Sequence, residues 1–310
     1  MSQSQSGQDI QAGQSIRDKH LVLLDTDIGD DIDDALALAL ALRSPEIELQ
    51  GITTVFGDTR LRARLAKHLL LNFGRDDIPV AAGQSLPLHL RHRPSGVPLA
   101  AILDACESGD ISACSGPELI AQRALANPGR LTLLCIGPLT NIATALVNEP
   151  GLVMAIRRII VMGGTSGIPW PDWNVRSDAK AAQIVLAAGV PITLLGWNIT
   201  TRCQLIPGDI ERLRRDDAPQ TRLLSQLIQV WQRRRPRWRS AYPTLHDPLT
   251  IAALCAPELL RFEEMTMRVL VHGPLQGFVA PRLMGGPLVH AAVDIQAAQA
   301  RKWIMKRLLS

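Results

Sequence analysis

A group of carboxylates stands near the start of the chain. Six aspartates occupy the ten positions from 25 to 34, directly after an apolar run and directly before an Ala/Leu run. Carboxylates held this close repel one another, so they need a compensating positive charge. A hard divalent cation such as Ca²⁺ or Mg²⁺ is the simplest one, because these ions prefer oxygen ligands and the segment contains no His or Cys. The segment is therefore a candidate metal site.

Helix capping is the structural alternative for these acids. Acidic residues ahead of a helix commonly serve as N-caps and as partners of the helix dipole. Capping satisfies only the few free N–H groups of a first turn, however, and six carboxylates exceed that need. A metal site is the better interpretation of the whole group.

Strand-like and helix-like segments alternate along the chain and could position these acids. The predicted strands are His20–Asp25, Ile47–Val55, Ile78–Ala82, Leu131–Ile136, Arg158–Met162 and Pro191–Leu195. The predicted helices are Asp33–Arg43, Thr59–Asn72, Pro117–Ala126, Leu139–Asn148 and Asp178–Ala188. The alternation predicts an α/β fold, with a mainly parallel central sheet flanked by helices on both faces.

The run Ala35–Leu42 alternates like a strand with one apolar face. Ala and Leu are nevertheless strong helix formers without β-branching, and Asp33 and Asp34 supply an acidic first turn. A helix here would be apolar on every side, so we expect it to be buried within the fold.

Short segments that carry polar residues or glycines end or follow several predicted strands. They cover residues 25–34, 53–58, 136–141 and 161–164. Because ligands of open α/β sheets bind beyond the carboxyl ends of the strands, we expect these segments to form the rim of one pocket.

Length and composition fit one α/β domain. The 310 residues are 46% hydrophobic, and no Gly/Ser/Pro-rich linker follows about His20. We expect a single domain over residues 19–310 and a disordered tail over residues 1–18, which are rich in Gln, Ser and Gly. The tail has no apolar region typical of a signal peptide, and no apolar run approaches the ~20 residues of a membrane span. Five scattered cysteines without a CxxC pair favour a reducing cytoplasm.

Much of the mild net charge of +4 comes from one segment. Residues 232–239 hold five arginines, with Trp231 directly before this segment and Trp238 within it. This pattern could bind nucleic acid through phosphate contacts and stacking, or it could be the solvated end of a helix with inward tryptophans. We favour the second interpretation and expect no nucleic-acid partner, because the rest of the chain is not basic.

Two short motifs complete the set of chemical residues. His246-Asp247-Pro248 and Asp172-Trp173-Asn174 are weak signals alone, since an N-cap or a turn would explain each. Together with the other segments they form an ordered series that resembles the inosine-uridine-preferring nucleoside hydrolase family. The series covers residues 25–35, 53–58, 137–143, 161–164, 172–174 and 246–248. The resemblance implies a Rossmann-like α/β core and a calcium-dependent enzyme that hydrolyses the N-glycosidic bond of ribonucleosides in nucleoside catabolism and salvage. It also suggests a homodimer or homotetramer.

The resemblance implies roles for individual residues. Asp27, Asp34 and Asp247 match the carboxylate ligands of calcium, and the backbone carbonyl of Ile136 matches a further ligand. Asp27 also matches the general base that takes a proton from the attacking water. His246 matches a proton donor to the departing base. The residues that match ribose-binding positions are Asp33, Asp58, Asp172 and Asn174.

The first motif departs from the family pattern DxDPGxDDA. Ile28 replaces the proline, and two extra residues precede the Asp-Asp pair. We align on Asp33 and Asp34 because they stand before Ala35, which leaves Asp30 and Asp31 without an assigned role.

Two further departures concern the sugar and the middle of the chain. The loop over residues 165–171 lacks the Asn that many members place on ribose, and Asp172 replaces a longer Glu. A His-containing stretch has no clear counterpart. His89 and His92 are candidates for it, but we interpret both as surface histidines.

Two alternatives to an active nucleoside hydrolase stay open. One is a haloacid dehalogenase-type phosphatase with Asp25 as nucleophile and Mg²⁺, although residues 29–31 fit that motif poorly. The other is a homologue that binds calcium and a nucleoside without turnover. The sequence does not reveal the preferred base, whose contacts we expect from loops and from residues 229–242.

Overall fold

Strands and helices alternate through the first two thirds of the chain, as the sequence predicts. The computed structural model describes residues 19–89, 96–103, 110–235, 240–282 and 284–310, so the predicted tail over residues 1–18 and His92 lie outside the described residues. The strands are β1 (His20–Thr26), β2 (Ile47–Thr54), β3 (Val80–Ala82), β4 (Leu131–Cys135), β5 (Ile156–Met162), β6 (Ile192–Leu195), β7 (Leu260–Val269), β8 (Val279–Pro281) and β9 (Leu288–Ile295). The α-helices are α1 (Asp33–Leu42), α2 (Thr59–Asn72), α3 (Gly116–Ala126), α4 (Thr140–Asn148), α5 (Leu152–Ala155), α6 (Trp173–Ser177), α7 (Ala179–Leu186), α8 (Trp197–Thr200), α9 (Pro207–Arg215), α10 (Pro219–Arg234), α11 (Pro248–Cys255) and α12 (Ala297–Leu308).

The strands form one sheet in the order β3-β2-β1-β4-β5-β6-β9-β7-β8. Every pair from β3 to β9 in this order is parallel, whereas β7 runs antiparallel to both β9 and β8. The mainly parallel sheet is therefore confirmed. Asp25 near the end of β1 lies level with Thr53 of β2 and Cys135 of β4. The segments that follow these strands consequently leave the sheet at the same edge.

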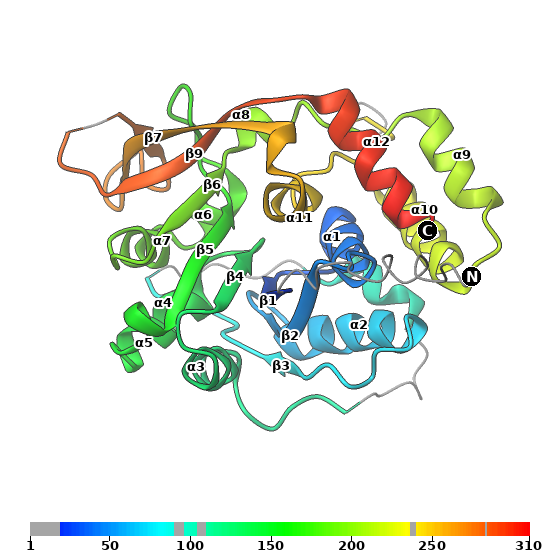
Figure 1. Cartoon of the computed structure of the whole chain (residues 1–310), viewed down its shortest axis with the longest axis horizontal. Coiled ribbons are helices and arrows are strands. Elements are labelled where there is room, and N and C mark those ends of the chain that lie inside the picture. Colours follow the sequence, from blue (N-terminus) through cyan, green and yellow to red (C-terminus); the bar gives the residue numbers. More distant parts are fainter. Residues whose placement is uncertain (1–18, 90–95, 104–109, 236–239, 283) are drawn as a thin grey trace, which may run out of the picture.

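Helices cover both faces of the sheet, as predicted. Helices α1, α2, α10, α11 and α12 pack on one face, and α3, α4, α5 and α7 pack on the other. Figure 1 shows the two groups on either side of the strands. Along β1, Val22 and Leu24 face the first core and Leu21 and Leu23 face the second. This period of two is what a strand buried on both faces requires.

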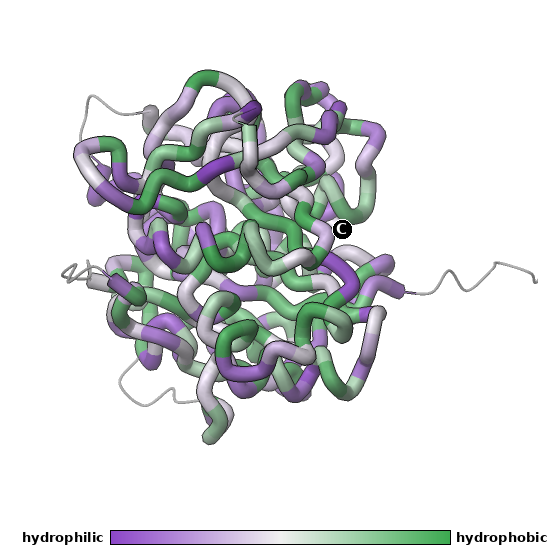
Figure 2. Tube along the Cα trace, turned by 90° about the vertical axis from the view of Figure 1, so that its left-hand side faces the viewer, coloured by the Kyte–Doolittle hydropathy of each residue, from purple (hydrophilic) through white to green (hydrophobic). Residues whose placement is uncertain are grey.

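Helix α1 is buried along nearly its whole length. Residues Asp33 to Ala41 are all buried, and the helix packs against α11, α12 and α2. The alternating Ala/Leu sequence thus forms a helix that is apolar on every side, as expected from its composition. Figure 2 shows hydrophobic stretches of the chain running through the middle of the molecule.

The last third of the chain contains elements to which the sequence pattern gave no assignment. They are α9, α12 and strands β7 to β9, of which β7 pairs antiparallel with the other two and which extend the parallel sheet at one edge, whereas the end of α10 and the start of α11 fall where the Arg-rich segment and Asp247 suggest a helix end and an N-cap. Among the described residues, no helix is both long and apolar enough to cross a membrane.

Candidate active site

A cavity of about 620 Å³ opens at the edge of the sheet where the parallel strands end. Its walls come from the loop after β1, the turns after β4 and β5, the end of α10 and the start of α11. It gathers most of the residues that the sequence singled out. The predicted site residues that line it are Asp27, Asp33, Asp34, Ile136, Asp172, Asn174, His246 and Asp247.

Three buried carboxylates form what we call the acidic cluster, namely Asp33, Asp34 and Asp247. One carboxylate oxygen of each lies within 4.8 Å of the others. The two aspartates of the pair open α1, and Asp247 directly precedes α11, so the packing of α1 against α11 assembles the cluster. The backbone N–H of Asp247 faces Asp33 Oδ2 at 3.4 Å, and the Thr26 hydroxyl donates to Asp34 Oδ1 at 2.5 Å.

The electrostatics of the acidic cluster favour a bound cation. Burial raises the pKa of all three carboxyls well above the usual range, and the negative charges of neighbouring aspartates raise these pKa values further. The charge of nearby Asp27 also raises the pKa of both Asp34 and Asp247. A hard divalent cation would hold these carboxylates ionised and match their all-oxygen donor set. The residues present therefore fit a metal such as calcium.

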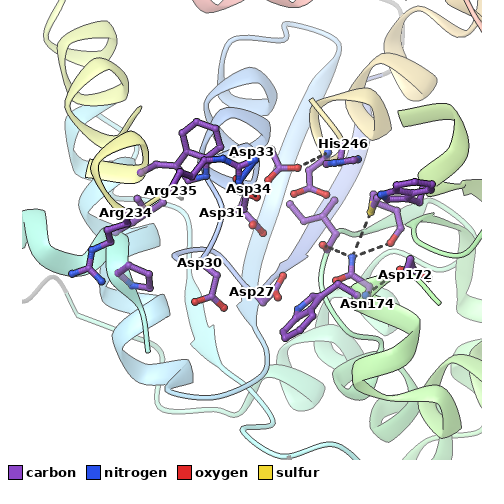
Figure 3. A pocket seen from close by; sticks show the side chains of 18 of the residues that line it. Asp27, Asp30, Asp31, Asp33, Asp34, Asp172, Asn174, Arg234, Arg235 and His246 are labelled. Atoms are coloured by element: carbon purple, nitrogen blue, oxygen red, sulfur yellow. Dashed lines mark hydrogen bonds and ion pairs between the residues drawn. The ribbon is translucent and has the colours of Figure 1, made fainter. Parts of the chain in front are cut away.

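Asp27 lies beside the acidic cluster in the same cavity (Figure 3). Burial raises the pKa of its carboxyl to about 6, although the positive charge of Arg62 opposes the shift. A glycine is needed next to it, because a Cβ on Gly137 would lie 2.9 Å from both the backbone nitrogen and Oδ1 of Asp27. The predicted carbonyl ligand, Ile136, immediately precedes this glycine and lines the cavity.

The longer first loop, with its two extra residues, is tied down by a buried arginine. Arg62 of α2 is fully buried and donates to the backbone oxygens of Phe56, Asp27 and Ile28. Its guanidinium also pairs with Asp30 at 2.8 Å. Asp30, which had no assigned role in the sequence, thus anchors the loop.

Asp172 and Asn174 stand at one end of the cavity (Figure 3). Asp172 caps α6 by accepting hydrogen bonds from the backbone of Asn174 and Val175, and it also accepts from Gly164. Burial raises the pKa of its carboxyl to about 6, against the effect of these hydrogen bonds. The Asn174 amide donates to the carbonyl oxygen of Ile136 at 2.9 Å. That carbonyl keeps a second lone pair with which it could bind a metal.

Two aspartates lie away from the cavity. Asp58, predicted to contact ribose, is exposed and caps α2 by accepting from the backbone of Leu61, and it is not part of the cavity wall. Asp25 is fully buried and accepts hydrogen bonds from Thr53 and Asn141. A phosphatase nucleophile must reach its substrate, so the position of Asp25 argues against that alternative. His89 is exposed, as expected for a surface histidine.

His246 is partly buried at the cavity wall. Its Nδ1 lies 2.7 Å from the Thr200 hydroxyl. Burial lowers the pKa of the imidazole to about 4, the charge of Asp31 raises this pKa by a smaller amount, and the charge of Arg235 lowers it further. The side chain is therefore neutral near pH 7, and a proton-donor role requires that substrate binding raise its pKa.

Tryptophans and arginines form parts of the wall that the sequence did not assign. Trp170 stacks on Trp197 with ring centroids 5.5 Å apart, and both line the cavity. Trp231 is buried, as the solvated-helix interpretation predicts, but Arg235 lines the cavity instead of pointing only to solvent. The run of arginines over residues 232–239 is the sequence feature that could have indicated Arg235 as part of the cavity wall. Trp170 and Trp197 meet only through the tertiary fold, so no local pattern could have paired them.

Comparison with known proteins gives consistent matches. The sequence profile described as inosine-uridine preferring nucleoside hydrolase matches residues 22–301. The probable uridine nucleosidase 2 of Arabidopsis thaliana is 32% identical over 95% of this chain and 99% of its own length. A pyrimidine-specific ribonucleoside hydrolase RihA of Shewanella baltica is 36% identical over 78% of this chain and 80% of its own. Among solved structures, a plant nucleoside hydrolase superposes with a TM-score of 0.85 at 27% identity, covering 94% of this chain and 99% of that one. A purine-preferring ribonucleoside hydrolase from Gardnerella vaginalis superposes with a TM-score of 0.81 at 26% identity, covering 93% of this chain and 98% of that one.

Proposed function

The chain belongs to the inosine-uridine preferring nucleoside hydrolase family, and from that premise we propose that it hydrolyses the N-glycosidic bond of ribonucleosides with a calcium ion held by its buried aspartates. The products are ribose and the free nucleobase. The observation that carries the proposal is the acidic cluster, whose carboxylate oxygens lie within 4.8 Å of one another inside a cavity large enough for a nucleoside.

Asp34, Asp247, Asp27 and the carbonyl of Ile136 are the residues that would hold the ion. Asp27 is not one of the three members of the acidic cluster but lines the same cavity, whereas Asp33, which the resemblance assigns to ribose, is a member. A bound divalent cation would orient a water molecule and lower the pKa of that water. Asp27 would take the proton of the water as general base, because its raised pKa lies close to neutral pH.

The remaining residues of the cavity would hold the substrate. Asp172 and Asn174 line one end of it and would position the ribose hydroxyls, while the carboxylates favour the positive charge that develops on the sugar. His246 would face the base. Asp58 is left out of this proposal, because its carboxylate is used in capping α2 outside the cavity.

Pyrimidine ribonucleosides, with uridine first, are the substrates we propose. The support is that a relative named uridine nucleosidase and one named pyrimidine-specific hydrolase are 32% and 36% identical to this chain. Base preference depends on contacts worth only ~1–3 kcal/mol each, so inosine belongs in the same test.

Ribose release from uridine, cytidine, inosine and adenosine, measured by a reducing-sugar assay, tests the proposal. We expect turnover of uridine that disappears on chelation and returns with added calcium. We expect Asp27→Asn to lower kcat by at least about 10²-fold while the protein stays folded. Binding of all four nucleosides with hydrolysis of none would instead favour a non-catalytic homologue.

A further inference from the structure

The cavity has two chemically different ends. Figure 3 shows the aspartates of the first loop in the middle, Asp172 and Asn174 on one side, and Arg234 and Arg235 on the other. If ribose is held at the Asp172 end, which rests on the proposed function, the base of the nucleoside extends toward the arginine end. Trp231 lines this end as well and offers an aromatic surface.

The guanidinium of Arg235 is held in place at this end. Arg235 caps the C-terminus of α10, and its guanidinium carbon lies 4.1 Å from the centroid of the Trp231 ring. Its Nε donates to the backbone oxygen of Ser240 at 3.1 Å. Only 21% of the side chain is exposed. These contacts fix the orientation of the guanidinium before any substrate arrives.

The terminal N–H groups of Arg235 remain suited to a ligand. Nη1 lies 3.9 Å from Oδ2 of Asp31, which is close enough for electrostatic attraction but beyond hydrogen-bond distance. Asp31 is one of the two extra residues of the first loop and lines the cavity. Arg234 lines the same end, but it is exposed. Of the two arginines, Arg235 is therefore the preorganised one.

We propose that Arg235 is a catalytic residue that stabilises the departing nucleobase, and that Asp31 and Trp231 position it. When the bond between C1′ and the base nitrogen breaks, its electron pair goes to the base. In a pyrimidine this negative charge spreads onto the carbonyl oxygen next to that nitrogen. The guanidinium donates hydrogen bonds to this oxygen and keeps its own protons, because arginine does not deprotonate in proteins.

The remaining atoms balance without a further reagent. The water oxygen bonds to C1′, and the proton of the water goes to Asp27. The base takes a proton from solvent, to which Asp27 returns its own. Arg235 therefore acts on the charge of the leaving group and not on the attacking water.

Two substrates separate this role from a structural one. Uridine has a poor leaving group, whereas 4-nitrophenyl β-ribofuranoside releases a phenolate that leaves readily without help. We expect Arg235→Gln to lower kcat for uridine by about 10²-fold, the usual effect of removing one preorganised donor, and to change turnover of the nitrophenyl riboside little. Arg235→Lys should recover part of the loss on uridine. Asp31→Asn should show a smaller loss with the same substrate dependence.

The matched control is Arg233→Gln, which makes the same charge change at an exposed position of α10 outside the cavity wall. It should turn over both substrates like the wild type. Equal losses on both substrates in Arg235→Gln and Arg235→Lys, or no loss on uridine, would overturn the role of Arg235. A wild-type protein that cleaves neither substrate with calcium present would instead contradict the proposed function.

Discussion

Arg62 places a fully buried guanidinium beneath the aspartate-rich loop. It binds three backbone oxygens and the Asp30 carboxylate, and its positive charge lowers the pKa of Asp27 and Asp34 against the effect of burial. A buried cation that satisfies several acceptors is hard to replace, since each acceptor would be left unpaired in a dry environment. Arg62 therefore both shapes the loop and relieves part of its repulsion.

Replacing this arginine tests its effect on stability. We expect Arg62→Gln to lower the free energy of unfolding by about 3 kcal/mol, because the change breaks a largely buried ion pair. It should also weaken calcium binding, since Asp27 would hold its proton more tightly. Urea unfolding and calcium titration measure the two effects.

Arg60→Gln is the control, at an exposed position of the same helix. Equal unfolding midpoints for the Arg60 and Arg62 variants would contradict the anchoring role.

At the scale of elements, the turn between β4 and α4 brings the backbone close to the first loop. Gly137 in this turn packs against Asp27 and against Val55 Cγ1, which would lie 2.8 Å from an added Cβ. The neighbouring backbone of Asp27 cannot give way as a flexible side-chain end could. The turn thus fixes where the proposed general base stands.

An added methyl group tests this contact. We expect Gly137→Ala to displace Asp27 and to lower kcat/KM for uridine by about 10²-fold, because a shift of about 1 Å in a catalytic group has effects of this size. Gly208→Ala is the matched control, since its Cβ would meet nothing within 4 Å. Similar kinetics for both variants would show that the contact does not position Asp27.

The elements themselves differ in how far the sequence predicts them. Helix α2 spans the predicted residues, and β1 to β6 agree with prediction within two residues, because buried parallel strands are short apolar runs separated by amphipathic helices. Strand β7 alternates buried and exposed residues only irregularly, which hides it from a pattern search. The resemblance predicts that Asp247 lies close to the aspartates of the first loop, and the acidic cluster brings them together. The capping role of Asp58 could not be predicted, because it depends on the local path of the chain.

At the scale of the whole molecule, buried carboxylates link stability to pH. Burial raises the pKa of Asp25 to about 7 and those of Asp27 and Asp172 to about 6, and it raises the values of the acidic cluster well above the usual range. Such groups stabilise the folded state when protonated, and this contribution is lost as pH rises through the folded pKa. His246, whose pKa is lowered, acts in the opposite direction below about pH 6.5.

The chelated protein should therefore lose stability as pH rises from about 4.5 to 7, because these carboxyls stay protonated in the folded state after they have ionised in the unfolded state. Each such carboxyl lowers the free energy of unfolding by about 1.4 kcal/mol per pH unit up to its folded-state pKa, and the single opposing histidine does not cancel their sum. Added calcium should flatten the dependence of stability on pH, because it holds the carboxylates ionised. Its binding should also release protons. Thermal unfolding at several pH values, with chelator or calcium, measures both. A melting temperature of the chelated protein that rises with pH across this range would contradict the assignment.

The acidic cluster joins residues 214 positions apart, one pair at the start of α1 and one residue just before α11. During synthesis, a ribosome-bound chain holds Asp33 and Asp34 long before Asp247 emerges from the exit tunnel. The cluster is complete only when most of the protein has been made and has folded. A partly made chain consequently lacks the complete cluster, and the proposed ion would find its full set of ligands only in the finished, folded protein.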